Sequence, residues 1–111
     1  MSKRPVSLLL DDICEAIDRI GQYTMDMSFD AFSKDRKSVD AVARNFEIVG
    51  EAANRLPDDF KKSHSEIEWH KIVGLRHRIV HEYFGIDVAI IWQILQKDLP
   101  LLRNALSRIR G

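Results

Sequence analysis

The spacing of apolar residues constrains the fold of this 111-residue chain more than any other feature. In each long segment the apolar side chains recur every three or four positions, which places them on one face of an α-helix. Leu9, Ile13 and Ile17 follow this pattern in one segment, and Val42 and Phe46 follow it in another. The sequence contains no strand-like alternation, no Asn-Gly hairpin turn and no glycine-rich phosphate loop. We therefore predict an all-α protein.

Capping residues and prolines set the limits of the first two helices. Pro5 suits a first helical turn because its missing N–H is not needed there, and this helix closes near residues 21–23. Ser38 is the expected N-cap of the second helix, and Pro57 ends it. The small residue Gly50 lies inside the second helix, so we expect another helix to approach it closely.

Two further helices are expected in the second half of the chain. Trp69 opens the third, which continues through the segment Ile72–Asp87. Gly85 suits the C′ position of the third helix, and Asp87 suits the N-cap of the fourth. Pro100 lies inside the fourth helix and should kink it or start a new turn.

A short helical turn at residues 58–64 completes the set of expected elements. The predicted architecture is an antiparallel four-helix bundle with a short additional helix. The length predicts one domain spanning residues 1–111.

Composition limits the classes of partner. The formal net charge is zero, which argues against a broad basic face for nucleic acid and leaves room for a local site. Cys14 is the only cysteine, so an intrachain disulfide is excluded and a reducing cytoplasm fits. The apolar run Val6–Leu10 is too short for a signal peptide, and nothing approaches transmembrane length. We expect a cytoplasmic protein with no membrane partner.

The segment Ile72–Asp87, IVGLRHRIVHEYFGID, concentrates titratable and hydrogen-bonding side chains among apolar residues at helical spacing. On a continuous helix His77 and His81 share a face, as do Arg78 and His81. Arg76 and His81 are five residues apart and point about 140° apart. Those two side chains converge only through the reach of arginine, a helix distortion or a second copy of the chain.

Three interpretations of this segment are open. His77 and His81 can hold zinc, but a site needs a third ligand and Glu82 points to a different face, which disfavours metal. An arginine binds phosphate oxygens and an imidazole transfers a proton, and together they can cleave RNA through its own 2′-hydroxyl without a metal or other cofactor. The third interpretation is a polar, ion-paired bundle helix, which the spacing alone favours. Glu51, on the second helix, is either solvent-exposed or directed at this segment.

Arg76-His77-Arg78-Ile79-Val80-His81 resembles the R-x4–6-H motif of HEPN domains. Its continuation to Tyr83 gives R-x4-H-x-Y, which is similar to the HepT-like branch, the ribonuclease toxins paired with a minimal nucleotidyltransferase antitoxin. The run Asn45–Ala53, NFEIVGEAA, is similar to the second-helix signature of that family. Residues 83–87, followed by Trp92 and residues 98–100, resemble its C-terminal half.

The resemblance implies roles for particular residues. Arg76 and His81 match the catalytic positions of a metal-independent endoribonuclease, and His77 takes an auxiliary position where the family often has Asn. Tyr83 matches the tyrosine that the antitoxin adenylylates with ATP, which silences the toxin in a type VII-like module. HEPN proteins usually form homodimers in which two motif helices face one cleft. The alternative is a non-catalytic HEPN adaptor that binds a nucleotidyltransferase or a nucleotide.

Overall fold

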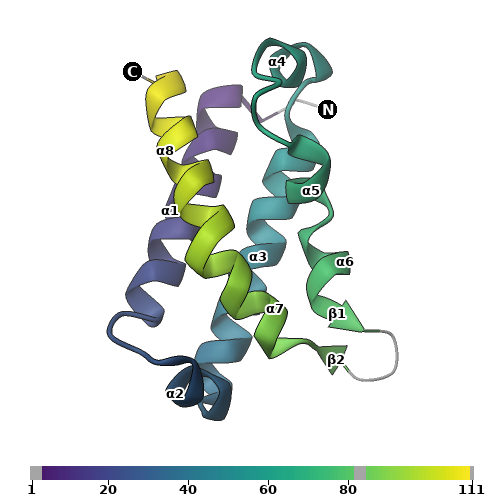
Figure 1. Cartoon of the computed structure of the whole chain (residues 1–111). Coiled ribbons are helices and arrows are strands. Elements are labelled where there is room, and N and C mark those ends of the chain that lie inside the picture. The colour runs from purple at the N-terminus through teal and green to yellow at the C-terminus, as the bar shows by residue number, and fades with distance from the viewer. Residues whose placement is uncertain (1–3, 82–84, 111) are drawn as a thin grey trace.

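The computed structural model describes residues 4–81 and 85–110, and these residues form an antiparallel bundle of four helical rods (Figure 1). The predictions of an all-α fold and of an antiparallel bundle are thereby confirmed. Two short helices, rather than one, are added at the ends of the bundle. The helices are α1 (Val6–Tyr23), α2 (Phe29–Lys34), α3 (Arg36–Arg55), α4 (Asp58–Ser63), α5 (Trp69–Val73), α6 (Leu75–Ile79), α7 (Val88–Gln93), the π-helix η1 (Ile94–Asp98) and α8 (Leu99–Arg110).

The core lies between the rods, where the apolar stripes of α1, α3 and α7–α8 meet. Phe46 of α3 and Phe32 of α2 are fully buried. The Phe32 ring packs 5.3 Å, between centroids, from Trp92 of α7, which fixes α2 across one end of the bundle. Among the described residues, Asn45 is the one buried polar side chain, and it donates to the Ala41 carbonyl while accepting from Arg19.

Two N-cap predictions can be compared with the structure. Asp87 caps α7 as predicted, accepting a hydrogen bond from the backbone N–H of Ile90, and Ser28 caps α2 in the same way through the N–H of Ala31. The prediction of Ser38 as N-cap of α3 is wrong, since α3 begins at Arg36. Asp35 is the cap, because its carboxylate accepts from both the N–H and the hydroxyl of Ser38.

Gly50 brings α3 and α5 into close contact. A Cβ atom at this position would lie 3.3 Å from the backbone carbonyl oxygens of both Ile72 and Val73. The predicted close approach of another helix at Gly50 is confirmed. It fixes the spacing between α3 and the rod formed by α5 and α6.

Pro100 is the second residue of α8, and the π-helix η1 immediately precedes that helix. A proline cannot donate a backbone hydrogen bond, and its ring crowds the carbonyl four residues earlier. The N–H of Leu99 instead reaches back five residues to the carbonyl of Ile94, which widens the turn just before the proline. The predicted change of helical geometry at Pro100 therefore takes the form of a π-helix just before the proline, and the rod continues through it.

The third rod departs from the prediction. Instead of one helix continuing to Gly85, Gly74 separates α5 from α6, and α6 ends at Ile79. Residues Val80–His81 (β1) then pair antiparallel with Gly85–Ile86 (β2), with His81 opposite Gly85. The N–H of Asp87 donates to the Ile79 carbonyl at 2.7 Å and so satisfies a free carbonyl at the helix end.

Gly85 therefore does not terminate a helix, which corrects its predicted C′ role. Its φ of +76° lies in the left-handed region that glycine tolerates, and it serves the return of the chain into β2. The β-branched pair Ile79 and Val80 favours extended backbone at the point where the helix stops.

Among the helices in the described part of the chain, none combines the length and apolarity needed to cross a membrane.

Candidate functional site

Arg76 lies on α6 with its side chain 66% exposed, facing α3. Its Nε atom is 3.8 Å from Oε1 of Glu47, and the other carboxylate oxygen of Glu47 is 3.6 Å from Nη1 of Arg44. Both distances exceed hydrogen-bonding range. An exposed pair of this kind contributes about 0–1 kcal/mol, so a stronger anionic ligand can displace Glu47 from Arg76.

A groove of about 370 Å³ runs between α3 and the α5–α6 rod at this point. Its polar residues come from both sides: α3 contributes Arg44, Glu47, Glu51 and Asn54, and α6 contributes Arg76 and His77. Glu51 is exposed, and it also lines the groove that contains Arg76. Its predicted exposure is confirmed, and its action on the segment around Arg76 stays a prediction. Two arginines and two glutamates give the groove no formal net charge while His77 is neutral.

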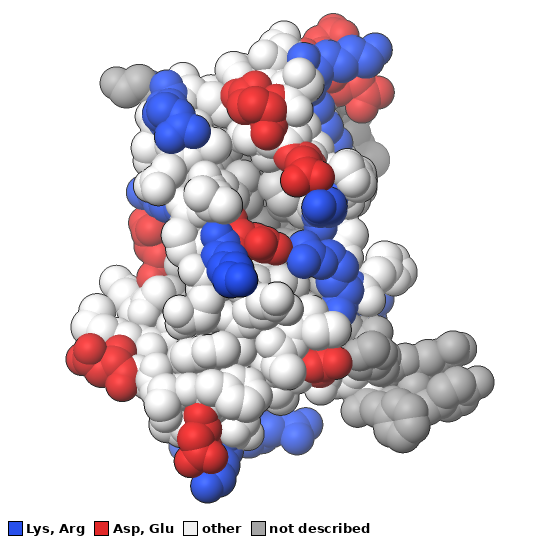
Figure 2. All heavy atoms as spheres, in the orientation of Figure 1, with Lys and Arg blue, Asp and Glu red and all other residues white. Residues whose placement is uncertain are grey.

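The charges on the visible face of the protein are interspersed. Figure 2 shows Lys and Arg side chains alternating with Asp and Glu over the coloured part of this face, without an extended area of one sign. This distribution agrees with the zero formal net charge of the sequence. Any binding of a polyanion is therefore expected at a local cluster of arginines.

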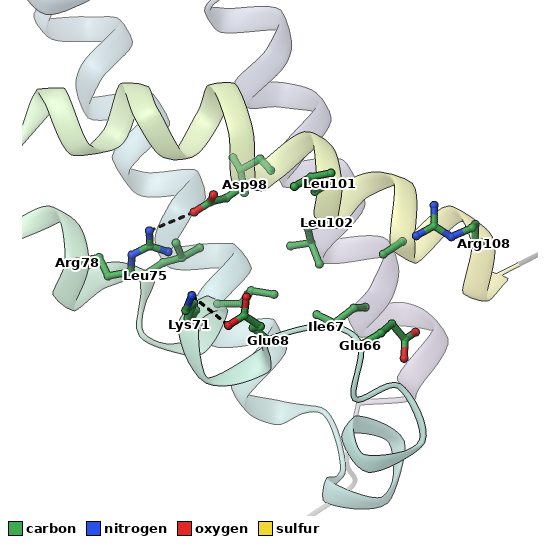
Figure 3. Close-up of a pocket in the computed structure, with 13 residues that line it drawn as sticks. Glu66, Ile67, Glu68, Lys71, Leu75, Arg78, Asp98, Leu101, Leu102 and Arg108 are labelled. Atoms are coloured by element: carbon green, nitrogen blue, oxygen red, sulfur yellow. Dashed lines mark hydrogen bonds and ion pairs between the residues drawn. The ribbon is translucent and has the colours of Figure 1, made fainter.

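Arg78 serves a different purpose from its neighbour Arg76. Its Nη2 donates to Oδ2 of Asp98 at 3.1 Å, which ties α6 to the π-helix η1. Figure 3 shows this guanidinium directed at Asp98, along a second groove of about 450 Å³ that has a largely apolar floor and includes Leu75 and Leu102. Arg78 and His81 do not share a helical face, because α6 ends at Ile79 and His81 lies in β1.

The structure places the residues of the predicted motif on different elements. Arg76 and His77 are exposed on α6 and line the same groove. His81 has its backbone in β1, two residues after the end of α6. The shared helical face of His77 and His81 and the 140° divergence of Arg76 and His81 both assumed a continuous helix, and that assumption is wrong because α6 ends at Ile79. Tyr83, the predicted modification site, and Glu82 lie outside the described residues.

Sequence reasoning missed two residues of this site, Arg44 and Glu47. Together with Glu51 and Asn54 they form a polar stripe at helical spacing along α3. This stripe lies beside Gly50, the residue already expected to contact another helix. A polar stripe flanking a predicted helix contact was the available signal for a groove at this position.

Comparison with known proteins adds independent information. Residues 13–109 match the family described as Ribonuclease HepT-like. The chain is 39% identical over 108 residues to the "Probable ribonuclease HepT" of Thermococcus cleftensis, covering 97% of this chain and 98% of the relative. It is 41% identical over 100 residues to the "Putative RNase MJ0127" of Methanocaldococcus jannaschii, covering 90% and 83% of the two chains. No solved structure matches the chain significantly.

Proposed function

Because the chain belongs to the ribonuclease HepT-like family, we propose that it is a cytoplasmic, metal-independent endoribonuclease and the toxin of a type VII-like toxin–antitoxin pair. The observation that carries this proposal is the position of Arg76. This first residue of the R-x4-H motif lines an open groove, and among the described residues it pairs with Glu47 at 3.8 Å, beyond hydrogen-bonding range. An arginine needed only for the fold is expected to resemble Arg78, which is hydrogen-bonded across two rods.

The proposed reaction uses the 2′-hydroxyl of RNA as the nucleophile. His81 accepts the proton of this hydroxyl while O2′ forms a bond to the adjacent phosphorus, and the bond from phosphorus to the 5′-oxygen breaks. The 5′-oxygen takes up a proton from water, so the products are a 2′,3′-cyclic phosphate and a 5′-hydroxyl. The guanidinium of Arg76 stabilises the charge that builds up on the phosphoryl oxygens in the transition state.

His77 takes an auxiliary role in this proposal. It is exposed on the same helix as Arg76 and lines the same groove. From that position its imidazole can donate a hydrogen bond to a phosphate or a ribose of bound RNA. We expect His77 to affect the binding of RNA more than the chemical step.

The proposed regulation acts at Tyr83. His81 and Gly85 pair across the β1–β2 ladder, so Tyr83 is the middle one of the three residues that connect them in sequence. A partner nucleotidyltransferase supplies ATP, the tyrosine oxygen bonds to the α-phosphorus, and pyrophosphate leaves. The added phosphodiester carries a negative charge that competes with RNA for Arg76.

Homodimerisation stays a prediction within this proposal. Its original geometric motive, the divergence of Arg76 and His81 on one helix, no longer applies because α6 ends at Ile79. The exposed groove between α3 and α6 supports it in a different way, since a second copy facing this groove would exclude water from an otherwise open site. We expect the dimer to persist after adenylylation.

The catalytic part is tested by incubating the purified protein with RNA in the presence of EDTA. Cleavage should continue and should leave 2′,3′-cyclic phosphate ends. Arg76→Ala and His81→Ala should each lower kcat by about 10²-fold or more, because each removes a group that acts in the transition state. Arg78→Ala is the matched control and should retain cleavage. Loss of activity in EDTA, or 5′-phosphate products, would contradict the mechanism, and RNA binding without cleavage would support the adaptor alternative.

The regulatory part is tested by the mass of the intact protein after incubation with the cognate nucleotidyltransferase and ATP. One AMP should be added to the wild type and to Tyr23→Phe, but not to Tyr83→Phe. Tyr23 is a suitable control because it is the other tyrosine of the chain and is exposed at the end of α1. Full ribonuclease activity in completely adenylylated protein would refute silencing.

A further inference from the structure

We propose that Arg44 is a second phosphate-binding residue of the RNA site, and that Glu47 occupies the position of an RNA phosphate between Arg44 and Arg76 until RNA displaces it. This inference rests on the proposed ribonuclease function and deepens it. Arg44 lies outside the R-x4-H motif and is 32 positions earlier in the chain than Arg76. Only the packing of α3 against the α5–α6 rod brings the two arginines to one groove.

The geometry of Glu47 carries the argument. Each oxygen of its carboxylate faces a different arginine, Oε2 at 3.6 Å from Arg44 and Oε1 at 3.8 Å from Arg76. A phosphodiester also carries one negative charge and presents two free oxygens, so it can take the same place between the two guanidinium groups. The arginines are therefore arranged around a single anionic group with two acceptor oxygens.

The weakness of the existing contacts makes this exchange feasible. The side chains of Arg44 and Arg76 are 69% and 66% exposed, and that of Glu47 is 44% exposed. The Arg44–Glu47 and Arg76–Glu47 pairs are longer than hydrogen bonds, whereas an arginine–phosphate contact is short, charge-assisted and often bidentate. RNA that displaces Glu47 exchanges two loose ion pairs for two tight ones.

The groove extends beyond these two arginines. Asn54 lines its other part and is ten residues after Arg44 on α3, which places their Cα atoms about 15 Å apart along the helix axis. The amide of Asn54 can donate to a phosphate or sugar oxygen without adding charge. The groove thus offers a path along α3 for an RNA backbone whose reacting phosphate lies at Arg76.

The test measures the affinity for single-stranded RNA that is 2′-O-methylated throughout, which cannot be cleaved because its nucleophile is blocked. Binding is followed over a series of KCl concentrations for the wild type, Arg44→Ala and Glu47→Gln. Arg44→Ala should weaken binding and lower the slope of log K against log [KCl] by about 0.7, the value for one phosphate contact on a single strand. Glu47→Gln should tighten binding, because it removes the competing charge.

Arg36→Ala is the matched control. Arg36 is on the same helix, is 86% exposed and pairs with Asp40 four residues later, but it does not line the groove. Its substitution should leave both the affinity and the salt slope as in the wild type. With cleavable RNA, Arg44→Ala should raise KM and should also lower kcat, though less than Arg76→Ala, because the phosphate that the two arginines share is the reacting one.

The outcomes separate this inference from the ribonuclease proposal. If RNA is cleaved in an Arg76-dependent manner but Arg44→Ala matches Arg36→Ala in affinity and slope, the inference is overturned and the function stands. If the salt slope depends on Arg44 but no cleavage occurs, the binding site stands and the ribonuclease proposal fails. Binding by Glu47→Gln that is weaker than that of the wild type would overturn the role assigned to its carboxylate.

Discussion

Two faces of the molecule use arginine in opposite ways. Along the α1–α8 contact, Arg103 donates to Asp18 at 3.0 Å and to Ser107 at 2.7 Å. In the α3–α6 groove, Arg44 and Arg76 share one carboxylate at distances beyond hydrogen-bonding range. The first arrangement connects two helices that are far apart in sequence, whereas the second leaves its cations able to exchange partners.

The hydrogen bonds of the α1–α8 contact also affect ionisation. The hydrogen bond to Asp18 raises the pKa of the Arg103 guanidinium. In the same α1–α8 contact, the hydrogen bond to Asp11 raises the pKa of the Arg110 guanidinium. These arginines are stabilised in their charged form by partners within the fold. The comparison teaches that the geometry of pairing, rather than residue type or local spacing, distinguishes an arginine that holds the fold from one that can hold a ligand.

The largest expected effect comes from removing the forked geometry of Arg76 while keeping its charge. Arg76→Lys should lower kcat for RNA cleavage by about 10²-fold or more, because a lysine cannot present two parallel donors to the phosphoryl oxygens. Arg103→Lys should leave kcat unchanged. The measurement is the cleavage rate at saturating RNA, and near-normal turnover by Arg76→Lys would remove the distinction between the two faces.

A smaller effect is expected from closing the approach between α3 and α5. Gly50→Ala places a methyl group 3.3 Å from two backbone carbonyls, and such overpacking should cost about 1–3 kcal/mol of unfolding free energy. The groove should be displaced as well, so cleavage should fall. Gly21→Ala is the control, since nothing lies within 4 Å of a Cβ there, and it should stabilise α1 by about 0.5–1 kcal/mol. The free energies of unfolding of both variants, measured by urea denaturation, decide whether the contact between α3 and α5 at Gly50 is rigid or can relax around a methyl group.

Much of the fold was predictable because it depends on local patterns. The apolar spacing placed the helical rods, and the cap Asp87 was identifiable from residue type and position. The close approach at Gly50 followed from the absence of a side chain. In each case the signal lies in the type and spacing of a few neighbouring residues.

The failures concern features that apolar spacing does not encode. After Ile79 the chain leaves the helix and folds back on itself in a short β-ladder. There Ile86 pairs with Val80, and the N–H of Asp87 donates to the Ile79 carbonyl. Apolar periodicity continues past this point and gave no signal of the return. The role of Arg44 was hidden for a similar reason. An Arg and a Glu three residues apart are common on exposed helices, and their nearness to Arg76 arises only from tertiary packing.

A further prediction concerns stability on the α1–α8 side. Arg103→Ala should lower the free energy of unfolding by about 1 kcal/mol or less, because both partners are partly exposed and screened by solvent, with side chains 35% and 54% accessible. Arg44→Ala should have no resolvable effect on stability. A double-mutant cycle with Asp18→Asn, measured at low and high salt, isolates the pair. Equal destabilisation by Arg103→Ala and Arg44→Ala would show that arginines of the α1–α8 contact and of the α3–α6 groove contribute equally to the stability of the fold.

The smallest expected effect lies at the rim of the apolar groove, where Lys71 pairs with Glu68 at 3.0 Å (Figure 3). This hydrogen bond lowers the pKa of Glu68 below its ordinary value. A carboxyl whose pKa is lower in the folded state adds stability above its unfolded pKa, and that contribution disappears as the pH falls through its folded pKa. Glu68→Gln should therefore have a slightly lower Tm than the wild type at neutral pH, and the two curves should converge below about pH 4. Lys71→Gln should remove the same increment, and the double variant should add nothing further. A Tm difference between the wild type and Glu68→Gln that widened on acidification would contradict this prediction. It would mean that the fold stabilises the protonated form of the Glu68 carboxyl and not its ion pair with Lys71.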